Sequence, residues 1–250
     1  MANDCGGKLT REHWISKGVL REVSDGKFVR IAGLPWQPPC QVDNLPPSSL
    51  GSKVLCERHN NALWPLEADG AHTRTVLDRF YLDQISHEDI GGNQFDLVSG
   101  EQLERWLLKT IWGATAVAPT APQIRAGVDR HMLSDYLFRD GLLPQGWGLY
   151  AKGLQTGGRS DPDVELAVSL MPIDGECYCG SIVVGGVELV FSFGTMDAGG
   201  GGTVVYRPSA IFLNRLGTDN CKVLALSWDH NTESIAQAVQ FTYGYGPPGT

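Results

Sequence analysis

Three observations predict an α+β protein. The middle of the chain spaces its apolar residues at three- and four-residue intervals, as amphipathic helices do. The last hundred residues contain several apolar and polar alternations of the kind seen in β-strands, separated by glycine-rich turns. The beginning of the chain is mixed and rich in proline. We therefore expect a small module at residues 1–66 and an α+β domain at 67–250, helical over 67–140 and β-rich over 147–230.

Short elements are expected in the N-terminal module. Gly6-Gly7 indicates a turn, after which a strand leads to Glu12-His13. Residues 33–49 contain five prolines and are expected to be irregular, because proline lacks a backbone donor and has a fixed φ. Around that stretch we expect strands at 8–10, 28–31 and 52–55 and a helix at 14–23.

The helical segment begins near Glu57 and is expected to break around Pro65. Apolar residues then recur on one face of each predicted helix. The pattern is strongest over residues 101–117, where Glu101 can also pair with Arg105 one turn later. These helices are expected at 68–85, 101–117 and 126–138.

The β-rich segment contains one clear hairpin, over residues 181–193, with its turn at Gly185-Gly186. Further strands are expected at 164–170, 204–206, 210–213 and 223–228. Residues 232–241 are expected to form a terminal helix that Thr232 caps.

Composition limits the function classes. The net charge is −8, which argues against a broad surface for binding phosphates. The charge is uneven, because residues 1–60 carry eight Lys/Arg against six Asp/Glu, whereas the remainder is strongly acidic. If nucleic acid is a partner, we expect the N-terminal module to contact it.

No apolar run approaches the roughly 18 residues needed to cross a bilayer, so we expect no membrane partner. The N-terminus lacks the basic and apolar regions of a signal peptide, so we expect a cytoplasmic protein. In that compartment cysteines bind metal or are buried more often than they form disulfides. The chain has six: Cys5, Cys40, Cys56, Cys177, Cys179 and Cys221.

Two patches in the N-terminal module carry residues suited to phosphodiester hydrolysis. That reaction needs a base to deprotonate water and a divalent cation to neutralise charge on the phosphate. Glu12-His13 sets a carboxylate beside an imidazole, and Asn60 follows in the second patch. Histidine is the natural base near neutral pH, while carboxylate and amide oxygens are suitable ligands for Mg²⁺ or Mn²⁺.

The second patch also contains Cys56-x-x-His59, which has the spacing of half a structural zinc site. Cys5 lies just before the Gly6-Gly7 turn and could contribute a third ligand, and Cys40 is available as the fourth. A second interpretation stays open. In it His59 binds the catalytic ion and Cys56 is merely buried.

Taken together, residues 5–66 resemble the HNH (ββα-metal) endonuclease family. The resemblance implies a zinc knuckle and a ββα-metal module, with His13 as general base and Glu12 and Asn60 as ligands of the catalytic ion. Asn44 resembles the intermediate Asn that orients the base. The structural zinc would be held by Cys5, Cys40, Cys56 and His59, although Lys8 stands where many members have a cysteine. DNA is then a better expected substrate than RNA, in a setting such as bacterial anti-phage defence.

A binding or sensor protein is the alternative. In this interpretation the module is an inactive zinc staple, and the β-rich segment binds a protein or a small molecule. The acidic composition favours this alternative, whereas Glu12-His13 and Asn60 favour the nuclease. A homo-oligomer and a regulatory ligand are compatible with both.

Overall fold

The computed structural model describes residues 7–24, 26–38, 41–86, 92–116, 121–152, 166–197, 203–229 and 237–243. These residues form helices and several sheets, about 33% helix and 38% strand, so the predicted α+β class is confirmed. None of the helices within these ranges is long and apolar enough to span a membrane.

The helices are, in chain order, α1 (Lys17–Val23), the 3₁₀ helix η1 (Pro47–Leu50), α2 (Glu57–Ala62), α3 (Trp64–Ile85), α4 (Gly100–Ala116) and α5 (Arg130–Phe138). The strands of the N-terminal part and the middle are β1 (Leu9–His13), β2 (Val29–Ala32), β3 (Val42–Leu45), β4 (Gly51–Cys56), β5 (Gln94–Ser99), β6 (Gln123–Ile124) and β7 (Gly148–Lys152). The remaining strands are β8 (Leu166–Ile173), β9 (Glu176–Val184), β10 (Val187–Ser192), β11 (Val204–Tyr206), β12 (Ala210–Arg215), β13 (Cys221–Ser227) and β14 (Ala238–Tyr243).

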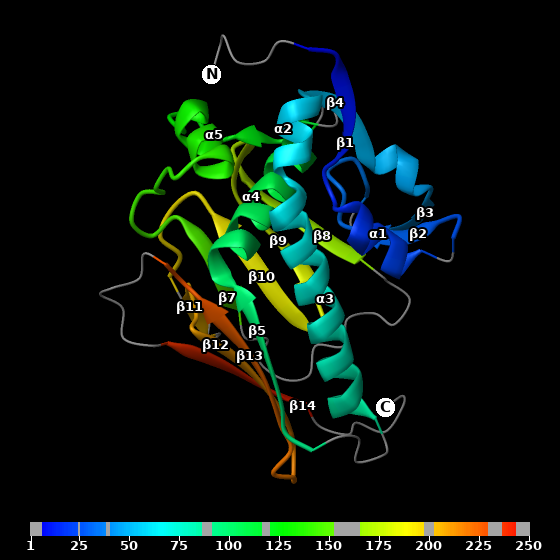
Figure 1. The fold of residues 1–250 in the computed structure, drawn as a ribbon, viewed down its shortest axis with the longest axis vertical. Coiled ribbons are helices and arrows are strands. Elements are labelled where there is room, and N and C mark those ends of the chain that lie inside the picture. Colours follow the sequence, from blue (N-terminus) through cyan, green and yellow to red (C-terminus); the bar gives the residue numbers. More distant parts are fainter. Residues whose placement is uncertain are drawn as a thin grey trace.

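The described strands form three sheets (Figure 1). The largest has the order β11-β7-β10-β9-β8-β2-β3, with β6 alongside β9. A four-stranded sheet has the order β14-β12-β13-β5, and β1 pairs with β4 in a separate antiparallel pair. The β9–β10 hairpin turns at Gly185-Gly186 as predicted, and both glycines have the positive φ that a tight hairpin turn requires.

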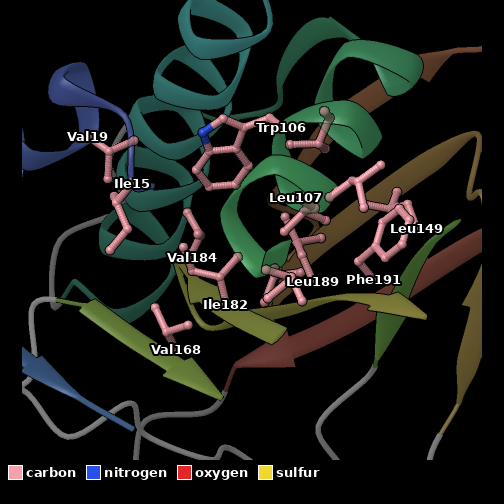
Figure 2. Packing of buried hydrophobic residues seen from close by; sticks show 14 of the residues in the cluster. Ile15, Val19, Trp106, Leu107, Leu149, Val168, Ile182, Val184, Leu189 and Phe191 are labelled. Carbon is pink, nitrogen blue, oxygen red and sulfur yellow. The ribbon is translucent and has the colours of Figure 1, made fainter. Parts of the chain in front are cut away.

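Helices α3 and α4 lie against each other in the middle of the molecule (Figure 1). Helix α4 also packs on β7, β9 and β10 of the largest sheet, and α3 on β5 and β12 of the four-stranded sheet. Figure 2 shows Trp106 and Leu107 of α4 beside Ile182 and Leu189 of that largest sheet. Buried residues from Trp14 to Tyr243 belong to one hydrophobic cluster. This core therefore contains residues from near both ends of the described chain.

Two local expectations are wrong, and one strand was not anticipated. Residues 238–241 were expected in the terminal helix, but they are part of β14, which alternates exposed and buried residues and runs parallel to β12. Residues 232–236 of that predicted helix lie outside the described ranges. The stretch 33–49 contains β3, which pairs with β2 and so joins the sheet of the C-terminal half. Strand β5 was not expected, because its pairing partner β13 lies more than a hundred residues later.

Candidate active site

The two sequence patches meet in a strand–strand–helix unit. Strand β1 runs antiparallel to β4, with Leu9 opposite Cys56 and His13 opposite Gly51, and α2 follows β4 directly. Residues 14–50, which separate the strands in sequence, contain α1, β2, β3 and η1. Glu12-His13 thus ends one strand, while Asn60 lies in the helix after the other. This order of elements is the one that the resemblance implies.

Glu12, His13 and Asn60 line one cavity of about 380 Å³. The cavity is bounded by the end of β1, by α2 and by the first turn of α3. Its other lining residues are Arg11, Lys17, Asn61, Trp64 and Glu67. The residues predicted to hold the catalytic ion and to activate water therefore line a common cavity.

Hydrogen bonds to β1 fix the orientation of the Asn60 side chain. The Thr10 hydroxyl donates to the main-chain oxygen of Leu55 (3.1 Å), so its oxygen accepts from Asn60 Nδ2 at 3.1 Å. The same nitrogen donates to the main-chain oxygen of Arg11 at 3.5 Å. The amide nitrogen is committed to the strand, and the oxygen is the atom suited to bind a cation.

His13 is in a setting that favours its neutral form. Burial lowers the pKa of its imidazole, and the positive charges of Lys17, Lys109 and Arg11 lower it further. Its Nδ1 is buried and has no hydrogen-bond partner in the described part of the chain. A neutral imidazole can accept a proton from water, as a general base must.

Glu12 lies in a buried ion-pair cluster. Its Oε1 is 2.5 Å from Lys109 Nζ, and that ammonium also contacts Glu67 Oε1 at 2.6 Å. Burial raises the pKa of Glu12 to about 7, against the opposing effect of the Lys109 charge. Two carboxylates of residues that line the cavity therefore contact a single ammonium.

Comparison of the chain with family models, curated proteins and solved structures gives no match. The function must therefore be inferred from the chemistry of the cavity. Glu12, Glu67 and Asn60 offer oxygen donors of the kind that a hard divalent ion prefers, and the Lys109 ammonium already occupies a position between two of them. The donor set fits Mg²⁺ or Mn²⁺. Within the described ranges, no group of three or more His, Cys, Asp or Glu could hold a metal ion.

Asn44 does not join the other predicted residues. It is exposed on β3, opposite Arg30 of β2, and does not line the cavity. Strand β3 follows α1 and β2 in the chain, and it places Asn44 in the largest sheet. A role in orienting His13 gains no support from this position.

Cys56 and His59 lie close together, as two ligands of one metal ion would. Cys56 Sγ is 3.2 Å from His59 Nδ1, and both residues are buried. The His59 ring packs on Phe138 of α5, with 4.9 Å between centroids, and His59 does not line the cavity. This geometry disfavours His59 as a ligand of the catalytic ion. Cys5 and Cys40, the other two predicted zinc ligands, lie outside the described residues.

Sequence reasoning did not identify six residues of the site: Arg11, Lys17, Asn61, Trp64, Glu67 and Lys109. A signal for Lys109 did exist. It lies within a run of buried residues in α4, from Trp106 to Ile111, where an unpaired charge would be costly. Such a lysine needs carboxylate partners, but the sequence does not identify which ones.

Proposed function

We propose that the chain is a metal-dependent HNH-type endonuclease that hydrolyses phosphodiester bonds, with DNA favoured over RNA as substrate. The observation that carries the proposal is that Glu12, His13 and Asn60 line one cavity. These residues are 48 positions apart at most in sequence, and the antiparallel pairing of β1 with β4 brings them together.

His13 is the proposed general base. Its lowered pKa keeps the imidazole neutral at pH 7, so that it can take the proton of a water molecule attacking phosphorus. Gly51, opposite His13 on β4, gives the ring room, since a Cβ at that position would approach His13 Cδ2 to 3.2 Å. The proposed base is thus held at the end of a paired strand.

Glu12 and Asn60 are the proposed ligands of Mg²⁺ or Mn²⁺. A bound divalent ion would stabilise the negative charge that develops on the phosphate. Asn60 is oriented for this role by its bonds to Thr10 and Arg11. Glu12 must give up at least part of its contact with Lys109 to take it.

The rim of the cavity carries groups suited to nucleic acid. Arg11 and Lys17 can neutralise phosphates, and Trp64 is 72% exposed beside them. An exposed indole can stack on a base, and this contact does not need a wide basic surface. The arrangement suits an acidic protein that contacts nucleic acid over a small area.

A zinc-stapled binding or sensor protein is the second candidate. The observation in its favour is the Lys109–Glu12 ion pair, which engages the carboxylate that the catalytic ion would need. This candidate assigns function to the β-rich half and predicts no cleavage with any cation. Anti-phage defence, a homo-oligomeric state and a regulatory ligand remain proposals under either candidate.

Nicking of supercoiled plasmid in Mg²⁺ or Mn²⁺ tests the nuclease. Loss of a general base typically costs about 10²–10⁴-fold, so His13→Ala should abolish detectable cleavage. His131→Ala, at an exposed position on α5, is the matched control and should cut as the wild type does. Equal rates for His13→Ala and the wild type would remove His13 from the mechanism.

A further inference from the structure

Lys109 reaches the candidate site from a different part of the fold. It lies in α4, which packs on the largest sheet, yet its ammonium contacts Glu12 of β1 and Glu67 of α3, two residues that line the cavity. Its side chain is only 6% exposed. A buried ammonium is stable only where opposite charges and hydrogen-bond acceptors surround it.

All three donors of this ammonium can be assigned. Nζ contacts Glu12 Oε1 at 2.5 Å and Glu67 Oε1 at 2.6 Å, and it donates to the main-chain oxygen of His13. An ammonium has three donors and no acceptor, so these contacts satisfy it. Its neighbours are therefore the proposed metal ligand, a second carboxylate and the backbone of the proposed base.

The same two carboxylates would attract a divalent ion. Glu12 and Glu67 both line the cavity, as does Asn60, and oxygen ligands of this type are those that Mg²⁺ and Mn²⁺ bind. An ammonium and a divalent ion bound to the same carboxylate lie close together and repel each other strongly. Binding of the ion and retention of the Lys109–Glu12 contact therefore oppose each other.

We propose that Lys109 is the resident cation of the site, which competes with a divalent ion for Glu12 and Glu67 and so sets the ion concentration at which the site fills. Glu67 is then a further ligand or positioning carboxylate for that ion. The proposal rests on the proposed function for the identity of the ion. It does not require that cleavage be observed.

Calorimetric titration of the full chain with MnCl₂ tests the competition directly. Lys109→Met removes the charge and keeps an unbranched side chain, and it should tighten Mn²⁺ binding by about tenfold or more. Lys109→Arg retains the charge and should bind Mn²⁺ nearly as weakly as the wild type. Lys152→Met removes a lysine that pairs with Glu188 at 3.3 Å outside the site, and should leave the affinity unchanged.

Thermal unfolding provides a second measurement of Mn²⁺ binding if Lys109→Met folds poorly without metal. Two carboxylates left without their ammonium repel each other, so this variant should have a lowered Tm that Mn²⁺ restores. The rise in Tm on adding Mn²⁺ should be larger for Lys109→Met than for the wild type. In Lys109→Met/Glu67→Gln the gain in affinity should shrink, since one of the released carboxylates is gone.

The outcomes separate this inference from the proposed nuclease. An Mn²⁺ affinity that is unchanged or weaker in Lys109→Met overturns the competition, even if plasmid nicking still depends on His13. Absence of Mn²⁺ binding in every variant overturns it as well. Tighter binding in Lys109→Met, together with no nicking by the wild type, upholds the competition and rejects the nuclease.

Discussion

Glu12 and His13 are neighbours in the chain, and burial favours the neutral form of both. For the carboxyl this means a raised pKa of about 7, and for the imidazole a pKa lowered below its usual value of 6.5. The two groups therefore respond differently to pH near neutrality. The imidazole is already a free base where the carboxyl is still partly protonated.

The proposed mechanism consequently predicts a pH profile governed by Glu12. Cleavage needs both groups deprotonated, so kcat/KM at low Mg²⁺ should rise through about pH 7, where Glu12 ionises. Saturating Mg²⁺ should move this rise to lower pH, because a bound cation favours the carboxylate. Rates measured from pH 5 to 9 at two Mg²⁺ concentrations check this. A profile flat above pH 6 at low Mg²⁺ would contradict the role of Glu12.

Trp64 allows a test of substrate contact that spares the fold. It is 72% exposed at the start of α3, so Trp64→Ala should change the free energy of unfolding little. Loss of one stacked base costs about 1–3 kcal/mol, so KM for nucleic acid should rise about tenfold or more. Trp36→Ala, which removes a 40% exposed indole that does not line the cavity, should leave KM unchanged. An unaltered KM in Trp64→Ala would exclude stacking.

At the level of elements, the contact between α3 and α4 determines where Lys109 can reach. Gly70 of α3 faces the Trp106 ring, and a Cβ at position 70 would lie 2.5 Å from that indole. The indole is 1% exposed and donates from Nε1 to the Ser16 hydroxyl at 2.8 Å. Glycine therefore permits the close approach of the two helices, and this approach brings α4 near the site.

Gly70→Ala should lower stability, although alanine is the better helix former. Overpacking of this kind costs about 1–3 kcal/mol, more than the roughly 0.5–1 kcal/mol gained from helix propensity. Urea unfolding monitored by circular dichroism measures the difference. Leu82→Ala, at a 60% exposed position of the same helix, is the control and should have a small effect. A stabilised Gly70→Ala would mean that the helices are not in close contact there.

At the level of the whole molecule, a buried network links helices and strands from distant parts of the sequence. Glu104 of α4 is fully buried and accepts hydrogen bonds from the Tyr136 hydroxyl of α5 and the Leu149 amide of β7. Arg207, between β11 and β12, donates to both of its oxygens at 2.9 and 2.7 Å. Arg207 has a φ of +41°, a conformation that this pairing helps to hold.

Glu104→Gln should therefore destabilise the entire fold. It removes the charge partner of a largely buried guanidinium, and breaking such pairs costs about 3–5 kcal/mol. Asp135→Asn, in an exposed pair with Arg139 at 3.4 Å, is the matched control and should cost at most about 1 kcal/mol. Chemical unfolding of both variants checks the contrast. Equal losses in the two variants would show that the Glu104 network contributes no more than a surface ion pair.

Local patterns in the sequence determined much of this architecture. The spacing of apolar residues predicted α4, and Gly185-Gly186 predicted the β9–β10 turn, because both depend on residues that are close in the chain. The two N-terminal patches led us to propose one site for Glu12, His13 and Asn60, and these three residues line one cavity. Apolar spacing and turn residues are reliable signals because neighbouring residues decide the conformation there.

Only the tertiary structure decided the partners of these elements. Strand β14 was mistaken for a helix because its conformation depends on pairing with β12. Asn44 does not line the cavity, because β3 joins a sheet otherwise built largely from the C-terminal half. Lys109 follows His13 by 96 residues, and no local pattern relates the two. Which buried charges meet is set by the packing of helices and sheets, and the candidate site owes its resident cation to that packing.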